Sequence, residues 1–207
     1  MKTTILLARH EVHGKDGALK NELPPAARDR ARARGKKLQE MFPPTFNAVS
    51  AYSSPQPRAL QTLIEMLCGY GRLVPIQTDD RLGDLEMERI NATPISEAAK
   101  RLGISVEEMC LRPKEVYPDL PSIMLHRAKV GADSLKEIAQ HHPDQVVFVS
   151  SHGGAKTEIA ILSLKNPNAK KFEDIGQPVQ MFATGQIAKL VIDSATGELL
   201  EEEYLDL

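Results

Sequence analysis

Two short apolar segments of this chain each run directly into a histidine. Residues 5–8 (ILLA) are followed by Arg9 and His10, and residues 146–149 (VVFV) are followed by the run SSHGG, which contains His152. Apolar runs of this length indicate buried strands, and open parallel sheets bind their ligands beyond the carboxyl ends of the strands. Two imidazoles and an arginine at that edge suit an anionic ligand.

Length and composition limit the class of protein. A chain of 207 residues favours one α/β domain and can bury a full core. Its 26 basic and 28 acidic residues give a net charge of -2, which favours neither nucleic acid nor a membrane as a partner. Cys68 and Cys110 are too few for a disulfide framework or a thiolate metal site, and no apolar run has the length of a signal-peptide core or a membrane span. We therefore expect a cytoplasmic domain whose anion site is made locally.

Expected strands and helices alternate along the rest of the chain, which indicates an α/β fold. Ser54 and Pro55 have the residue types of a helix N-cap and a first helical position. Further strands are expected over 46–52, 74–78 and 145–150, with a closing hairpin of 186–192 and 199–204. Helices are expected over 24–42, 55–69, 95–102, 106–111, 120–142 and 155–164.

Residues 79–144 interrupt this alternation, because they hold helices and no clear strand. The segment is long for a simple crossover between strands. We expect residues 85–143 to form a helical excursion over the carboxyl edge of the sheet, where it can shape a pocket. The sequence contains no internal repeat, low-complexity tract or linker, so residues 1–207 are expected to form a single domain.

Three segments together carry a resemblance to a known family. They are Leu7-Ala8-Arg9-His10, the run from Ser53 to Thr62 (SSPQPRALQT) and the run from Val149 to Gly154 (VSSHGG). In their order and spacing these segments resemble the histidine phosphatase superfamily, also called the phosphoglycerate mutase-like fold, and they span most of the chain. The resemblance implies a three-layer sandwich in which helices flank a mostly parallel central sheet.

The resemblance also implies a mechanism that runs through a phosphohistidine and needs neither a metal nor a cofactor. His10 matches the nucleophile, Arg9 and Arg58 match the phosphate-binding arginines, and His152 matches the second histidine of the phosphate pocket. These residue types suit the chemistry, because a neutral imidazole can attack phosphorus and water can cleave the phosphoramidate that results. Guanidinium groups bind phosphoryl oxygens at two points and offset their charge in the transition state. Gly153 lets the backbone approach a bound anion closely.

The mechanism needs an acid that protonates the departing alcohol, because an alkoxide is a poor leaving group near neutral pH. In the family this residue usually follows a leucine after the third strand, and here Leu82-Gly83-Asp84 matches that spacing best. We therefore expect Asp84 to be the general acid, with Glu86 and Glu88 as alternatives.

The residue after His10 departs from the family, which commonly has glycine where this chain has Glu11. A carboxylate that points into the pocket repels phosphate, whereas one that points away, or that transfers a proton, is compatible with activity. His13 is close enough to His10 in the sequence to line the pocket mouth. Glu11 and His13 are therefore candidate substrate-binding residues, together with Arg9, Arg58, His152 and Gly153.

Three functions fit these features. The first is a phosphomonoesterase that hydrolyses a small phosphorylated metabolite through phospho-His10. The second is a phosphoglycerate mutase, which returns the phosphoryl group to a second hydroxyl of its substrate, and the third is an inactive relative that binds phosphorylated ligands or proteins. The hydrolase is favoured because the basic residues of the excursion form no recognisable arrangement; they are Lys100, Arg101, Arg112, Lys114, Arg127 and Lys129.

Two other features receive no function of their own. The basic run 28–37 has interleaved alanines and no aromatic residue, which indicates a solvated helix face rather than a nucleic-acid site. His141 and His142 are adjacent and so do not share a helix face, and no metal site is expected there. We expect a small phosphorylated substrate as the partner, no nucleic acid and no membrane, and the sequence leaves a homodimer open.

Overall fold

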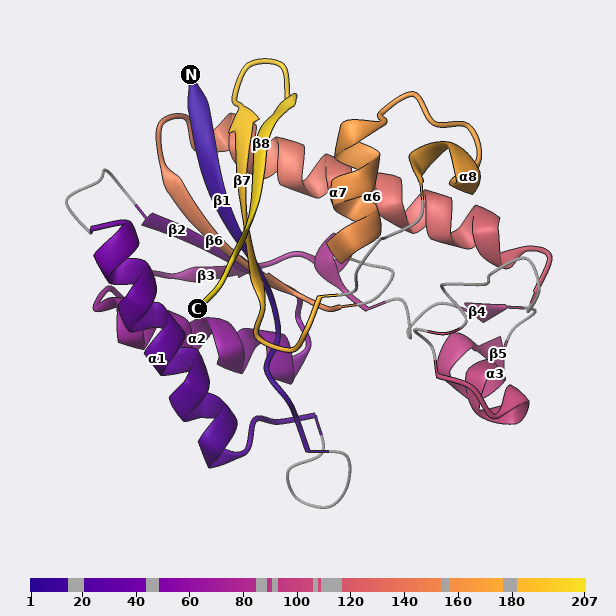
Figure 1. Cartoon of the computed structure of the whole chain (residues 1–207), viewed down its shortest axis with the longest axis horizontal. Helices are drawn as coiled ribbons and strands as arrows, with labels where there is room; N and C mark the ends of the chain where they lie inside the picture. The colour runs from indigo at the N-terminus through magenta and orange to yellow at the C-terminus, as the bar shows by residue number, and fades with distance from the viewer. Residues whose placement is uncertain are drawn as a thin grey trace.

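The computed structural model of this chain has a six-stranded sheet at its centre (Figure 1). It describes residues 1–14, 21–43, 49–84, 89–90, 93–105, 108, 117–153, 157–176 and 182–207. The strands of the sheet are β1 (Lys2–Arg9), β2 (Val49–Ser53), β3 (Ile76–Thr78), β6 (Val146–Ser151), β7 (Ile187–Asp193) and β8 (Leu199–Leu205). In the order β3-β2-β6-β1-β7-β8, the first four strands are parallel and the last two add antiparallel pairs. The mostly parallel sheet is thereby confirmed.

The strands β1 and β6 lie next to each other in the middle of the sheet. All of β6 and residues 5–8 of β1 are buried. Parallel strands that are covered on both faces carry continuous apolar runs, which explains why these two segments stand out in the sequence. The parallel register pairs Arg9 with Ser151. The residues that follow the two strands, His10 and His152, therefore meet at one edge of the sheet.

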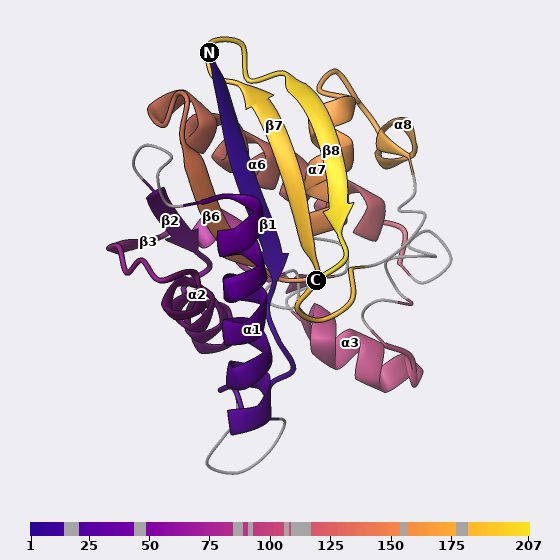
Figure 2. The same cartoon turned by 60° about the vertical axis from the view of Figure 1, so that its left-hand side comes forward.

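Helices cover both faces of the sheet, so the molecule has the three layers that the sequence predicted (Figures 1 and 2). The helices α1 (Pro25–Met41) and α2 (Pro57–Tyr70) lie on one face, and α6 (Leu120–His141) and α7 (Thr157–Lys165) lie on the other. Alternate residues of β1 and β6 point to each side, as the strand repeat requires. Those facing α1 and α2 include Leu6, Ala8 and Phe148, and those facing α6 and α7 include Ile5, Leu7, Val147 and Val149.

A second and smaller core lies beside the sheet. There α3 (Ile95–Leu102) and the short helix α8 (Phe172–Ile175) pack with the first turns of α6. The strands β4 (Arg89–Ile90) and β5 (Thr93–Pro94) form an antiparallel pair in the same region, where the sequence predicted helices and no strand. That prediction was wrong because two-residue strands are too short to produce an alternating apolar pattern. Of the helix expected over 106–111, the structure describes only Glu108.

The helix α2 begins two residues after the predicted first position at Pro55. Pro57 is its first residue, and Gln56 occupies the N-cap position without a side-chain hydrogen bond. Ser54 is therefore not the cap, and its hydroxyl instead lies 2.8 Å from Nε2 of His152. The preference for proline at the first helical position is met by Pro57 rather than by Pro55.

The other predicted elements are confirmed, with differences at their ends. β3 is shorter than the strand expected over 74–78, and residues 46–48 and 155–156 lie outside the described residues. The four-residue helix α8 was not predicted, because one helical turn carries too little periodic signal. Across the part of the chain that the structure describes, none of the helices has both the length and the apolar composition that a membrane crossing requires.

The helices α1 and α2 touch each other at two glycines. A β-carbon on Gly35 would overlap the carbonyl group of Met66, and one on Gly69 would overlap the backbone of Arg32. Only glycine allows two helix backbones to approach so closely. The contact sets the position of α2 against α1, and α2 carries Arg58 in its first turn.

We expect Gly35→Ala to lower the free energy of unfolding by about 1 to 3 kcal/mol, the usual cost of overpacking a close contact. Helix propensity acts in the opposite direction, because alanine favours a helix more than glycine does. Urea denaturation measures the change, and Lys36→Ala on the exposed face of the same helix is the control, with a change within about 0.5 kcal/mol. A Gly35→Ala protein as stable as wild type would show that the helices can separate at no cost.

Candidate active site

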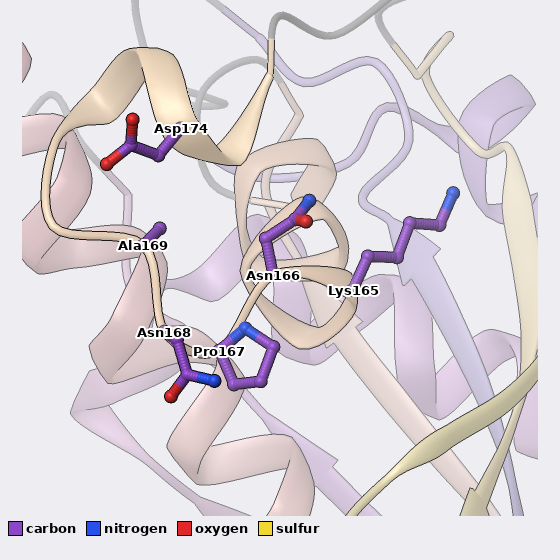
Figure 3. A pocket seen from close by; sticks show the side chains of 6 residues that line it. All are labelled: Lys165, Asn166, Pro167, Asn168, Ala169 and Asp174. Carbon is purple, nitrogen blue, oxygen red and sulfur yellow. The ribbon is translucent and has the colours of Figure 1, made fainter.

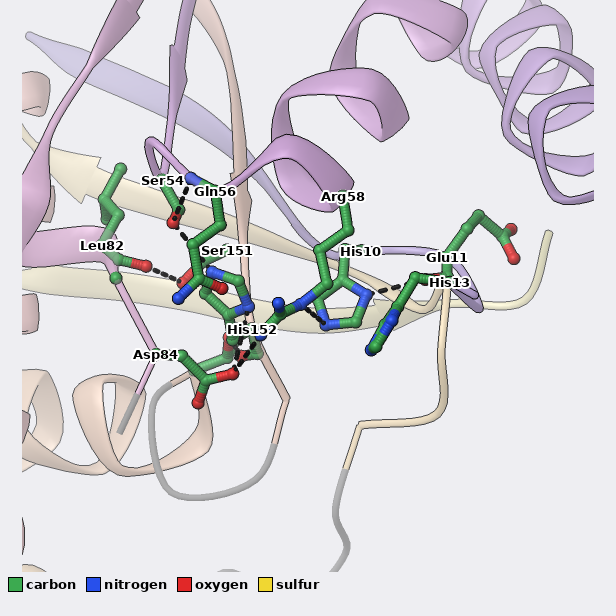
Figure 4. A network of polar contacts seen from close by, with 12 residues as sticks. His10, Glu11, His13, Ser54, Gln56, Arg58, Leu82, Asp84, Ser151 and His152 are labelled. Atoms are coloured by element: carbon green, nitrogen blue, oxygen red, sulfur yellow. Dashed lines mark hydrogen bonds and ion pairs between the residues drawn. The ribbon is translucent and has the colours of Figure 1, made fainter. Parts of the chain in front are cut away.

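Four buried side chains from separate segments meet beyond the carboxyl ends of β1 and β6 (Figure 4). The ring centroids of His10 and His152 are 5.1 Å apart. Arg58 donates a hydrogen bond from Nε to Nε2 of His10 over 3.1 Å. It also donates from Nη2 to Oδ2 of Asp84 over 2.6 Å. The structure thus brings together four of the residues that the sequence singled out.

Each ring nitrogen of His10 has a defined partner. Nδ1 lies 2.7 Å from the carbonyl oxygen of Glu11, which can only accept, so Nδ1 carries the proton. Nε2 accepts from Arg58 and therefore presents a lone pair. Burial above all, and then the charges of His152, Arg58 and Arg9, lower the pKa of His10 to about 2. The ring is neutral at physiological pH, which is the form that can act as a nucleophile.

Asp84 lies between Arg58 and His152. Its Oδ2 accepts the hydrogen bond from Arg58 and lies 3.4 Å from Nδ1 of His152. The 3-10 turn η2 (Asp80–Leu82) precedes Asp84, and the Ser151 hydroxyl donates to the last carbonyl of that turn over 2.8 Å. This bond ties the end of β6 to the turn and so fixes the carboxyl group relative to the histidines.

Ser54 is a member of the site that sequence reasoning missed. Its hydroxyl lies 2.8 Å from Nε2 of His152, and its backbone N–H donates to the carbonyl of Ser150 over 2.9 Å. Ser54 directly follows β2, so it stands beyond the carboxyl end of a strand just as His10 does. That position is the signal that could have identified it, whereas the Ser-Pro pair indicated a helix cap instead.

Arg9 approaches the cluster from the last position of β1. Its Nη1 donates to the carbonyl of Phe182, and the N–H of Phe182 donates to the buried carboxylate of Glu158. A β-carbon on Gly153 would overlap the Arg9 guanidinium, so glycine leaves the room that this side chain occupies. The positive charge of Arg9 lowers the pKa of His10, so the Arg9 guanidinium acts electrostatically on the cluster.

These converging segments are shared with a known protein family. The sequence profile of the histidine phosphatase superfamily (branch 1) matches residues 6–199. The chain belongs to this superfamily. The matched range contains every residue of the cluster described above.

Solved structures with the superfamily fold include phosphatases and a mutase. The protein YhfR of Bacillus stearothermophilus is 19% identical with a TM-score of 0.65, over 96% of this chain and 94% of that one. Phosphoserine phosphatase from Entamoeba histolytica, solved with 3-phosphoglyceric acid, is 18% identical with a TM-score of 0.65, over 99% and 98%. Phosphoglycerate mutase from Bacillus anthracis is 17% identical with a TM-score of 0.66, over 99% and 92%. At these identities the likeness shows the fold alone, and no curated protein sequence matches the chain.

The two candidate substrate-binding residues after His10 take different positions. The ring of His13 lies against His10, with centroids 5.4 Å apart. The carboxylate of Glu11 points away from the histidine rings (Figure 4) and forms ion pairs with Arg30 and Arg34 of α1. Of the two orientations that the sequence left open, the Glu11 side chain therefore takes the one that points away from the histidines.

The alternative acids Glu86 and Glu88 lie outside the described residues, as does Gly154. Among the residues that are described, no group of three or more histidine, cysteine, aspartate or glutamate side chains is arranged to hold a metal ion.

Two surface hollows include no residue of the cluster. One of about 360 Å³ is lined by residues 165–169 and Asp174, where α7 connects to α8 (Figure 3). The other, of about 400 Å³, lies beside β3 and the end of α6, and its lining includes Asp79, Arg81 and Glu137. In that hollow Arg81 is paired with both Asp79 and Glu137.

The lowered pKa of His10 predicts a loss of stability in acid. The unfolded chain binds a proton at the ordinary histidine pKa of 6.5, whereas the folded site binds it only near pH 2. The stabilisation by the neutral ring is therefore complete above pH 6.5 and decreases as the pH falls toward 2. Between pH 7 and pH 5, we expect the unfolding free energy of His10→Gln to decrease by about 2 kcal/mol less than that of wild type.

Urea denaturation of both proteins at the two pH values measures this difference. His141→Gln, which alters an exposed histidine, is the control and should keep the wild-type pH dependence. Identical pH dependence in wild type and His10→Gln would contradict a neutral, buried His10.

Proposed function

We propose that this protein is a metal-independent phosphomonoesterase that works through a phosphohistidine on His10 and acts on a small phosphorylated metabolite. The observation that carries the proposal is the state of His10, whose neutral ring presents the Nε2 lone pair to a guanidinium group. A lone pair and a phosphate-binding cation at one point are what an attack on a bound phosphoryl group requires.

In the first step the phosphoryl group of the substrate takes the place of Nε2 as the partner of Arg58. Arg58, Arg9 and His152 bind the phosphoryl oxygens and offset their charge as it redistributes in the transition state. The Nε2 lone pair of His10 attacks phosphorus in line, so the N–P bond forms while the P–O bond to the alcohol breaks. The proton stays on Nδ1 and is donated in a hydrogen bond to the carbonyl of Glu11, which stabilises the positive charge that develops on the ring.

The departing oxygen needs a proton, and Oδ2 of Asp84 lies 3.4 Å from Nδ1 of His152 and 2.6 Å from Nη2 of Arg58. When the phosphoryl group replaces the carboxylate as the partner of Arg58, Asp84 takes up a proton from the solvent and donates it to the departing alcohol; the carboxylate then takes a proton from the water that attacks the phosphohistidine. The N–P bond breaks in that second step, inorganic phosphate leaves, and His10 regains its lone pair. Glu86 and Glu88 remain the alternatives for this role.

We infer the substrate class from the groups at the anion site and from the ligand in a solved structure that shares the fold. The cluster offers Arg58, His10 and His152, and the charge of Arg9 acts on His10 as well; these groups suit one phosphoryl group on a small alcohol. Entamoeba phosphoserine phosphatase, which has this fold, was solved with 3-phosphoglyceric acid, and that supports a phosphorylated small metabolite as the substrate here.

We expect the purified protein to hydrolyse para-nitrophenyl phosphate in the presence of a chelator and to be inhibited by vanadate. His10→Ala should lower kcat by about 10³-fold or more, because it removes the nucleophile. His141→Ala is the control and should keep wild-type turnover, and circular dichroism checks that both variants are folded.

Retained turnover in His10→Ala would remove the nucleophile from the mechanism. A phosphoenzyme that transfers its group only to phosphoglycerate would instead identify a mutase. The lack of any phosphoenzyme would indicate a protein that binds phosphorylated ligands without turning them over.

We expect Asp84→Asn to slow the hydrolysis of alkyl phosphates by about 10²-fold more than that of para-nitrophenyl phosphate, because nitrophenolate leaves without a proton. The ratio of kcat values on the two substrates separates loss of the acid from general damage at Arg58. Asp80→Asn alters an exposed carboxylate in the preceding turn and should leave the ratio unchanged. Equal losses on the two substrates would transfer the acid role to Glu86 or Glu88.

A further inference from the structure

Glu11 follows the proposed nucleophile directly and is almost completely buried, with 1% of its surface exposed. A carboxylate in this position is stable only if cations and hydrogen-bond donors take the place of water. Both come from α1, where Arg34 contacts Oε1 through Nη1 and Arg30 donates from Nε to Oε2 over 3.3 Å. The side chain that departs from the family pattern is therefore anchored to a helix.

The loop before β7 leaves room for this ion pair. Gly185 has a φ of +75°, and a β-carbon there would overlap both the Arg34 guanidinium and the Glu11 carboxylate. The N–H of Gly185 points at the carbonyls of Arg9 and His10, with 3.2 Å to each oxygen. The same glycine thus borders the ion pair on one side and supports the nucleophile's backbone on the other.

The backbone of Glu11 is connected to the catalytic cluster on both sides. Its N–H donates to Oγ1 of Thr62 over 3.0 Å, and the Thr62 hydroxyl donates to the carbonyl of Arg58 over 2.8 Å. Its carbonyl accepts the Nδ1 proton of His10 over 2.7 Å. Any movement of the Glu11 peptide group therefore changes the acceptor that the imidazole depends on.

That acceptor decides which nitrogen of His10 can react. A neutral imidazole carries its proton on the nitrogen that has the better acceptor, and only the other nitrogen has a lone pair. With the Glu11 carbonyl in place, the proton stays on Nδ1 and Nε2 can attack. Without it, the hydrogen bond from Arg58 still favours a lone pair on Nε2, but less strongly than the two contacts together. The fraction of rings with the proton on Nε2, which cannot act as a nucleophile, therefore increases.

We propose that Glu11 is a positioning residue for the nucleophile: its carboxylate, anchored by Arg34 and Arg30, holds the Glu11 carbonyl where it keeps the His10 proton on Nδ1. The ion pair also neutralises the carboxylate, so an acidic residue can stand next to an anion site without repelling phosphate. Burial lowers the pKa of Arg34, so the buried guanidinium depends on a counter-charge such as the Glu11 carboxylate that it contacts. The effect on phosphorylation rests on the proposed function, whereas the effect on the tautomer does not.

The test compares Glu11→Gln and Arg34→Gln with a matched control. Arg32→Gln removes another arginine of α1, which forms an ion pair of 2.6 Å with Glu65 and is half exposed. Nitrogen-15 NMR of the ligand-free proteins at pH 8 reads the proton position on the His10 ring. Single-turnover phosphorylation with para-nitrophenyl phosphate reads the rate of attack.

We expect wild type and Arg32→Gln to hold the proton on Nδ1 and to be phosphorylated at the same rate. Glu11→Gln and Arg34→Gln should show a mixture of both tautomers and a rate about tenfold lower, as is usual when a supporting partner of a reacting histidine is lost. Arg34→Lys keeps the charge and should restore part of the rate. Unfolding transitions show which variants are folded, and if Arg34→Gln is not, Glu11→Gln and Arg34→Lys decide.

Unchanged tautomer and unchanged rate in folded Glu11→Gln would overturn the proposal. So would a lower rate with the wild-type tautomer, since the loss would then have another cause. If the tautomer shifts but no variant, wild type included, is phosphorylated, the positioning role of Glu11 stands and the proposed function fails.

Discussion

The parallel pairing of β1 with β6 is the interaction on which the site depends. It places Arg9 beside Ser151, and the backbone N–H of His10 continues the ladder with a 3.0 Å hydrogen bond to the Ser151 carbonyl. A slip of one residue in this register would turn every side chain of one strand to the opposite face. The pairing thus fixes both the distance between His10 and His152 and the side of the sheet on which they meet. The apolar side chains of the two strands stabilise the register, because they fill the cores on both faces.

The electrostatics of the site follow from burial. Guanidinium groups next to two imidazoles would repel them strongly if all were charged, and the low pKa of His10 removes one of those charges. Asp84 lies between Arg58 and His152, and its negative charge compensates that of Arg58. In the same way, Arg30 and Arg34 of α1 compensate the charge of the buried Glu11 carboxylate. Burying these charges without their partners would cost several kcal/mol for each group.

The sequence was informative wherever a residue's role depends on strand ends and motif spacing. The α/β layers and the meeting of His10 and His152 could be predicted because buried parallel strands carry continuous apolar runs and deliver their following residues to one edge. Arg58 and Asp84 were predicted from the resemblance to the family. The partners of Glu11 could not, since Arg30 and Arg34 lie in a basic run that has the composition of a solvated helix face. Ser54 was read as a helix cap because local chemistry favours that role, and only the tertiary position of His152 overrides it. The pair β4 and β5 is too short for any periodicity to show.

The hydrogen bond from Arg58 to Nε2 of His10 has a consequence for the resting protein. The guanidinium covers the Nε2 lone pair, through which His10 attacks in the proposed mechanism. A neutral electrophile has nothing with which to draw the guanidinium away, whereas a dianion competes for it directly. Under that mechanism, binding of an anion would also expose the lone pair, and selectivity for charged substrates would follow from this one hydrogen bond.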